Sequence, residues 1–173
     1  MCAVMRLRVI SVVVVLVFWA GFSWTDEEAP LNPEFPEVVF TSFDGESTTT
    51  MSAFRGRPVL LTFWASWCGP CRVELPELSK LYGELAGRGF VLITVNVDHN
   101  PMAGRRYLES LGLSLPVYRL NPHDTKSLGI DALPANILLD ADGRFVQAYK
   151  GYTPVVVEEV RRLVLEMTTA EEP

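Results

Sequence analysis

Hydrophobic residues recur in two patterns along the chain, and these predict buried strands that alternate with amphipathic helices. Residues 58–64 and 90–97 are nearly continuous apolar runs, which is typical of central strands covered on both faces. Between them, residues 69–85 place leucines on one face of a helix. Pro76 lies inside that helix and should kink it, because proline lacks the N–H that a helical hydrogen bond needs. This strand–helix–strand order predicts a βαβ unit with parallel strands.

Shorter segments on either side complete the prediction of an α/β domain. Asp44-Gly45 is a turn signal between two short strands, which predicts a hairpin before the first central strand. A second hairpin is expected about residues 140–143, followed by a closing amphipathic helix. The other expected elements are strands at 38–40, 48–50, 117–120, 135–139 and 145–150, and helices at 101–111, 125–129 and 154–167.

The first 25 residues form a separate segment. Arg6 and Arg8 precede an uncharged apolar run from Val9 to Trp24, and acidic residues follow it. This charge pattern predicts a secretory signal peptide or a signal anchor. A membrane span needs about 20 apolar residues, so the run is marginal in length. Because the candidate cleavage sites lack well-placed small residues, we expect an uncleaved N-terminal apolar helix that anchors the protein in a membrane.

Composition and charge narrow the class of protein. We expect the anchor or signal peptide over residues 1–25, a proline-containing linker over 26–36, one domain over 37–168 and a tail over 169–173. The formal net charge of −6 argues against a nucleic-acid partner, since nucleic acids select basic surfaces. Three cysteines are too few for a disulfide scaffold, and Cys2, at the extreme N-terminus, receives no role.

The candidate chemistry lies where the first central strand meets the helix, at Trp67-Cys68-Gly69-Pro70-Cys71. Unpaired backbone N–H groups and the helix dipole favour a thiolate at a helix N-terminus, which lowers the pKa of that cysteine. The second cysteine lies one turn on, close enough to close a disulfide. The motif therefore predicts thiol–disulfide exchange.

A zinc site is the other use of a paired cysteine motif. Such a site needs about four ligands, usually with a second cysteine pair or a pair of histidines. The chain has only His99 and His123, which are distant in sequence and lack ligand spacing. We therefore expect neither a metal nor any cofactor beyond a redox-active disulfide. Asp98 and Asn100, which flank His99, are expected to be polar loop residues.

The segment from Val59 to Cys71 resembles the active-site strand and turn of thioredoxin. The lead-in 54–58, the segment 72–76 and Leu133-Pro134 before the strand that ends at 140–143 narrow this resemblance to the TlpA/ResA-like thioredoxins. These relatives are membrane-tethered and extracytoplasmic. The resemblance covers about residues 35–168 and implies a thioredoxin-like three-layer α/β fold, with a mixed central sheet and an N-terminal β-hairpin extension.

The resemblance assigns roles to each residue of the motif. Cys68 is the expected attacking thiol, and Cys71 is the expected resolving thiol that releases the product. Trp67 offers a flat apolar surface to partners, the alternative being a core aromatic residue. Gly69 leaves room for a partner next to Cys68. Pro70 stiffens the turn, and in the thioredoxin family this glycine–proline pair goes with reducing behaviour.

Pro134 is the candidate for the family's cis-proline. Because proline has no N–H, it would leave the backbone of Leu133 free to pair with an extended substrate peptide. The alternative is a trans proline that merely starts an edge strand. The relatives often carry two threonines next, whereas Ala135 and Asn136 stand here, which leaves the substrate preference open.

Glu74 is the expected proton carrier of the site. It lies three residues after Cys71 and therefore on the same helix face. A partly buried carboxyl there would have a raised pKa and could exchange protons with the thiol. Thr62 stands where ordinary thioredoxins have a buried aspartate, which strengthens this interpretation. The alternative is a solvated glutamate that interacts favourably with the helix dipole.

Together these features predict a monomeric thiol–disulfide oxidoreductase on the extracytoplasmic face of the bacterial cytoplasmic membrane, or in the periplasm or medium if the signal is cleaved. The resemblance implies a reductase of protein disulfides that draws electrons from a transmembrane thiol donor, with apocytochrome c as a target. The alternatives are a general disulfide reductase or oxidant, and a non-enzymatic thioredoxin-fold assembly module. A peroxidase is disfavoured, because the expected lone peroxidatic cysteine and its motif are lacking.

Overall fold

The computed structural model describes residues 33–169. The predicted N-terminal apolar helix, most of the linker and the last four residues of the tail lie outside this range. Within residues 33–169 no helix combines the length and the apolar character that a membrane crossing requires. Phe35, which the prediction places in the linker, is buried and packs against Phe145 with ring centroids 5.6 Å apart.

Seven strands form one mixed sheet in the described part of the chain, in the order β2-β1-β5-β4-β3-β6-β7. They are β1 (Val39–Ser42), β2 (Thr48–Thr50), β3 (Val59–Trp64), β4 (Val91–Asn96), β5 (Val117–Arg119), β6 (Ala135–Leu139) and β7 (Phe145–Lys150). The pairs β3–β4 and β4–β5 are parallel, and the other four pairs are antiparallel. The predicted parallel βαβ unit, the N-terminal hairpin and the mixed sheet are therefore confirmed.

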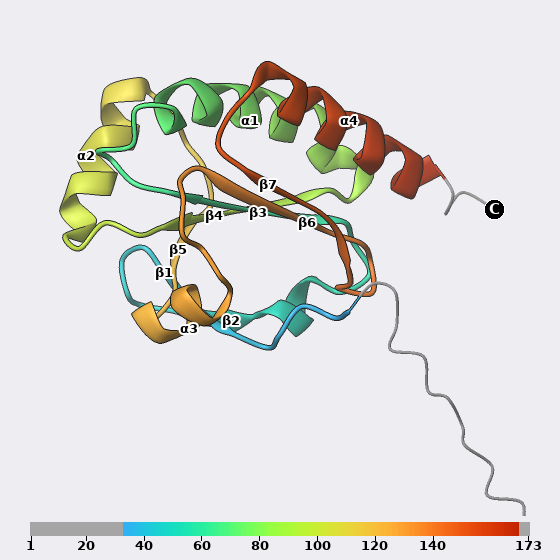
Figure 1. The fold of residues 1–173 in the computed structure, drawn as a ribbon, viewed down its shortest axis with the longest axis horizontal. Coiled ribbons are helices and arrows are strands. Elements are labelled where there is room, and N and C mark those ends of the chain that lie inside the picture. Colours follow the sequence, from blue (N-terminus) through green and yellow to red (C-terminus); the bar gives the residue numbers. More distant parts are fainter. Residues whose placement is uncertain (1–32, 170–173) are drawn as a thin grey trace, which may run out of the picture.

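The helices lie on both faces of this sheet (Figure 1). They are α1 (Cys71–Leu85), α2 (Pro101–Leu111), α3 (Pro122–Ser127) and α4 (Pro154–Thr169), with short 3₁₀ helices η1 (Met51–Phe54) and η2 (Ala86–Arg88). In Figure 1, α1 and α4 run along one face, while α3 and η1 lie on the other. These three layers and the mixed sheet make the fold thioredoxin-like, as predicted.

Alternation along β3 divides the core between the two faces of the sheet. Leu61 and Phe63 belong to the apolar cluster on the η1 side, whereas Leu60 packs with residues of α1 and α4. Successive side chains of a strand point to opposite faces, so Thr62 and Trp64 face the α1 side as Leu60 does. This alternation places a polar residue, Thr62, on the face of the sheet that packs against the start of α1.

Two helix starts differ from the prediction. The helix α1 begins at Cys71 rather than at residue 69, because Gly69 and Pro70 form the turn that precedes it. The helix α3 begins at Pro122, three residues earlier than expected. There the Asn121 side chain accepts a hydrogen bond from the Asp124 N–H and proline occupies the first helical position, a combination that starts helices.

Candidate active site

Cys68 and Cys71 form a disulfide at the junction of β3 and α1, with an S–S distance of 2.04 Å. The Cys71 N–H donates a hydrogen bond to Cys68 Sγ at 3.2 Å. Cys68 is 4% exposed and Cys71 is fully buried, so Cys68 is the more accessible of the pair, as predicted. The sulfur of Cys68 thus sits at the N-terminus of a helix, where an N–H group can stabilise a thiolate.

An open cavity of about 500 Å³ lies beside the disulfide. Its lining includes Trp67, Cys68, Gly69, Pro70 and Leu133. Trp67 is 71% exposed, which contradicts the alternative of a core aromatic residue. Gly69 has open space where a side chain would project, so a partner can approach the disulfide from that side. The structure therefore gathers five of the predicted site residues around one cavity.

The segment before β6 forms the other wall of the cavity. The Leu133–Pro134 peptide bond is cis, which confirms that prediction. Pro134 is buried, and its carbonyl accepts a hydrogen bond from the Gly151 N–H at 2.7 Å. Within residues 33–169, the backbone N–H and C=O of Leu133 make no hydrogen bond. Both groups are therefore available to an extended peptide that enters the cavity.

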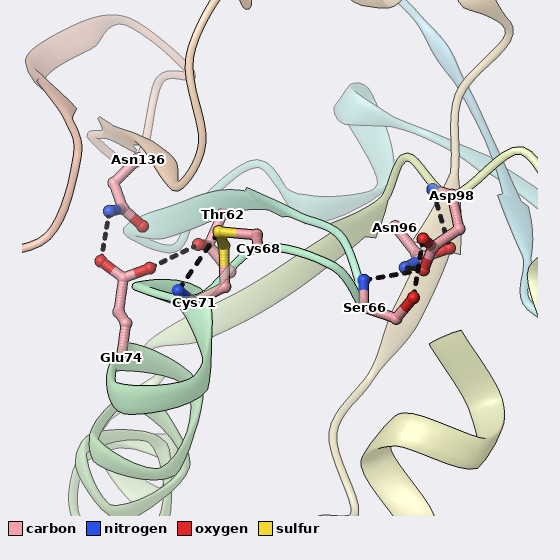
Figure 2. The surroundings of a disulfide bond; sticks show 8 residues. All are labelled: Thr62, Ser66, Cys68, Cys71, Glu74, Asn96, Asp98 and Asn136. Carbon is pink, nitrogen blue, oxygen red and sulfur yellow. Dashed lines mark hydrogen bonds between the residues drawn. A yellow bond between two sulfur atoms is a disulfide. The ribbon is translucent and has the colours of Figure 1, made fainter. Parts of the chain in front are cut away.

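Glu74 is fully buried on α1, more deeply than predicted, and two polar side chains of the sheet face its carboxyl (Figure 2). Asn136 Nδ2 donates to Glu74 Oε1 at 2.7 Å, and Thr62 Oγ1 lies 3.5 Å from Oε2. Burial raises the pKa of Glu74 to about 7, while the hydrogen bonds from Asn136 and Thr62 oppose this rise. The alternative of a solvated glutamate is therefore wrong.

Asp98 is a buried residue of the site that the sequence analysis placed in a polar loop. Its carboxylate is 4% exposed and accepts hydrogen bonds from the Ser66 N–H and hydroxyl, both at 2.9 Å, and from Asn96 Nδ2 at 2.8 Å. Ser66 lies two residues before Cys68, so Asp98 fixes the loop that carries Cys68. The expectation failed because the contact depends on the parallel register, which pairs Trp64 with Asn96 and brings the ends of β3 and β4 together.

The helix α2 packs against the Asn96 side chain that holds Asp98. A Cβ atom built on Gly104 would lie 2.7 Å from Asn96 Nδ2, closer than side chains approach one another. Glycine at this position thus lets α2 lie directly against the Asn96 amide that donates to Asp98. Tyr107 of α2 packs on Trp64 with ring centroids 5.8 Å apart.

The comparisons with known proteins agree with this geometry. The profile of the Redoxin family matches residues 30–163. The chain belongs to the Redoxin family. This Redoxin-family protein is 33% identical over 162 residues to the thiol-disulfide oxidoreductase ResA of Halalkalibacterium halodurans, a match that covers 91% of this chain and 90% of that one. It is 29% identical to the ResA of Bacillus cereus, over 86% of each chain.

A solved structure of a thiol-disulfide oxidoreductase from Bacteroides fragilis superposes with a TM-score of 0.66 at 27% identity, covering 76% of this chain and 99% of that one. The resemblance to TlpA/ResA-like proteins is thus confirmed, and the Redoxin-family protein is a thiol–disulfide oxidoreductase. This finding favours an enzyme over a non-enzymatic assembly module. The functional roles of the individual residues, including Glu74 and Pro134, stay predictions.

Proposed function

We propose that this enzyme reduces protein disulfides through the Cys68–Cys71 pair, with the disulfide itself as its only redox centre. The observation that supports this most strongly is the placement of the pair. Cys68 borders an open cavity at the start of a helix, while Cys71 is fully buried behind it. This arrangement fits a Cys68 thiol that reacts with substrates and a Cys71 thiol that reacts only with Cys68. The Gly69-Pro70 turn supports reduction as the direction.

The reaction begins from the dithiol form of the enzyme. The Cys68 thiolate attacks one sulfur of a substrate disulfide, which forms a mixed disulfide and releases the other substrate sulfur as a thiolate that takes up a proton. The Cys71 thiolate then attacks Cys68 Sγ and releases the second substrate thiol. Two electrons pass to the substrate, and the enzyme is left with the Cys68–Cys71 disulfide. A thiol donor must then reduce this disulfide, and we propose a transmembrane thiol carrier.

Glu74 serves as the proton acceptor in this scheme. Cys71 must lose a proton before it can attack, and Glu74 lies one helical turn away on the same face of α1. A carboxyl with a pKa of about 7 can both take up and give back a proton near neutral pH. The proton passes from Cys71 Sγ to a Glu74 oxygen, and from there it returns to the solvent or the leaving thiolate.

The substrate is an extended peptide in the cavity between the motif and the segment before β6. Its backbone pairs with the unpaired groups of Leu133, and Trp67 covers one side of its cysteine. Reduced apocytochrome c is the proposed product, which follows from the resemblance to TlpA/ResA-like proteins. The proposed location is the extracytoplasmic face of the bacterial cytoplasmic membrane, where a monomer is held by the N-terminal segment outside the described residues.

The reduction potential of the Cys68–Cys71 pair in the full chain, equilibrated against defined dithiol buffers, tests the direction of electron flow. A value near roughly −270 mV, as in thioredoxin, supports a reductase. A value near roughly −120 mV marks an oxidant and contradicts the proposal. As a control, Cys71→Ser should accumulate the mixed disulfide with an oxidised substrate peptide, whereas Cys68→Ser should not.

A further inference from the structure

Asn136 makes the shortest hydrogen bond to the Glu74 carboxyl, although it lies 62 residues further along the chain. It occupies the β6 position directly opposite Thr62 of β3. Both side chains are fully buried and face α1, and the Glu74 carboxyl lies against both of them (Figure 2). In the sequence, Asn136 bears only on substrate preference, and nothing in the motif predicts this contact.

The amide of Asn136 is only half satisfied in this arrangement. Its Nδ2 donates to Glu74, but its Oδ1 is buried and has no hydrogen-bond partner. A buried acceptor without a donor is unfavourable. Protonation of Glu74 creates the missing donor, because a carboxylic acid carries an O–H group. A half-turn of the amide brings Oδ1 to the place where Nδ2 now lies and lets it accept that O–H, while Nδ2 moves to the place that Oδ1 leaves.

Both polar groups that face Glu74 can switch in this way, because a hydroxyl and an amide each donate or accept. The other ionisable groups nearby are Cys71 and Glu77 on α1, Tyr149, which lies opposite Asn136 on β7, and Tyr152, whose hydroxyl donates to Glu77 Oε2 at 2.7 Å. The charge of Glu77 raises the pKa of Glu74, but less than burial does. The hydrogen bond from Asn136 is thus the largest influence that favours the carboxylate.

We propose that Asn136 is a positioning residue that holds the Glu74 carboxyl in both protonation states and thereby sets the pH at which Glu74 accepts the proton of Cys71. In the ionised state Nδ2 donates to the carboxylate, and in the neutral state Oδ1 accepts from the acid. No electron moves in this step, since only a proton passes between Cys71 Sγ and Glu74. The inference rests on the proposed role of Glu74 and adds the residue that controls it.

Infrared titration of the protonated carboxyl band in the oxidised full chain tests the proposal, with the band assigned by its loss in Glu74→Gln. Asn136→Leu removes the donor while keeping a similar volume, so the titration midpoint of Glu74 should rise by about one pH unit or more. Asn136→Thr keeps a hydroxyl donor and should raise it less. An unchanged midpoint in Asn136→Leu overturns the proposal. If the leucine variant does not form the disulfide or fold, Asn136→Ala, which also removes the donor, provides the same comparison.

The pH profile of thiol alkylation in the reduced enzyme then tests whether the effect passes through Glu74. Asn136→Leu should move the profile in the wild-type background and leave it unmoved in the Glu74→Gln background. An equal movement in both backgrounds overturns the inference, because Asn136 would then act on the thiols by another route. If Glu74→Gln alone leaves the profile unchanged, the proposed role of Glu74 fails as well. The reductase direction is judged separately by the reduction potential.

Discussion

Two buried carboxyl groups flank the disulfide, and their surroundings differ (Figure 2). Asp98 accepts three hydrogen bonds of 2.8–2.9 Å from Ser66 and Asn96. Glu74 accepts one of 2.7 Å from Asn136 and faces Thr62 at 3.5 Å. Both side chains are almost inaccessible to solvent. Burial raises the pKa of Glu74, and only the hydrogen bond from Asn136 and the Thr62 hydroxyl oppose this rise, whereas the Asp98 carboxylate is held by three donors.

The two groups also act on different parts of the motif. Asp98 holds Ser66, in the loop that leads to Cys68, and it does so from the end of β4. Glu74 lies on α1, one turn beyond Cys71. One carboxyl therefore fixes the loop next to Cys68, while the other lies one turn from Cys71, the thiol with which we propose that it exchanges protons.

Replacement of Asp98 should have the largest effect on stability. Asp98→Ala leaves the Ser66 N–H, the Ser66 hydroxyl and the Asn96 amide without their acceptor, and we expect a loss of about 4 kcal/mol in the free energy of unfolding. Urea unfolding at constant pH measures it. Ser66→Ala removes only one donor and should lower the stability by about 1 kcal/mol. A loss below about 1 kcal/mol in Asp98→Ala would show that the carboxylate is not an anchor.

Replacement of Glu74 should instead change how the stability of the protein depends on pH. Its folded-state pKa of about 7 lies above the ordinary value of 4.5, so its contribution to stability is fully present below pH 4.5 and is lost as the pH rises through 7. Glu74→Gln stays neutral and avoids this loss. The stability of the wild type relative to the variant should therefore fall by up to about 3 kcal/mol between acidic pH and pH 8.

Urea unfolding of the oxidised proteins across this pH range measures the difference. At the acidic end both side chains are neutral and similar in shape, so the two stabilities should agree within about 1 kcal/mol, which serves as an internal control. Two parallel curves would contradict the assignment of Glu74 as a buried carboxyl that titrates near neutral pH.

Local sequence was sufficient to predict one half of this site. The presence of a helix after β3, the order of Cys68 and Cys71, and the face that Glu74 shares with Cys71 all follow from residues within one or two helical turns. The strands β3 and β4 and their parallel pairing followed from apolar runs joined by a helix. These features depend on short separations along the chain, where periodicity and helix geometry decide the outcome.

The partners of both carboxyl groups could not be predicted in this way. Asn136 meets Glu74 only because the antiparallel register of β3 and β6 sets it opposite Thr62. Asp98 meets Ser66 across 32 residues because the parallel strands β3 and β4 end at the same edge. A shift of one residue in either register would turn these side chains to the other face. Because β3, β4 and β6 are buried at every position, their sequences lack the alternation of apolar and polar residues that would determine the register.

A smaller loss of stability should follow from crowding the Asn96 side chain, which donates to Asp98. Gly104→Ala places a Cβ 2.7 Å from Asn96 Nδ2, so the amide must move away from Asp98, and we expect a loss of about 1–2 kcal/mol. Gly83→Ala is the matched control, since a Cβ there meets nothing within 4 Å in the interior of α1 and should be neutral or stabilising by about 0.5–1 kcal/mol. Equal effects of the two changes would mean that Asn96 does not constrain α2.

The smallest expected effect concerns the charge of Glu77. Its carboxylate raises the pKa of Glu74, so Glu77→Gln should lower the infrared midpoint of Glu74 by less than about half a pH unit. Tyr152→Phe, which removes a hydrogen bond to Glu77 but keeps its charge, is the control.

Glu77 is partly exposed. Salt at about 1 M should therefore suppress its effect, whereas the effect of Asn136→Leu should persist, because a buried hydrogen bond is screened far less. A shift in Glu77→Gln as large as that in Asn136→Leu would mean that charge, and not the number of donors, governs Glu74.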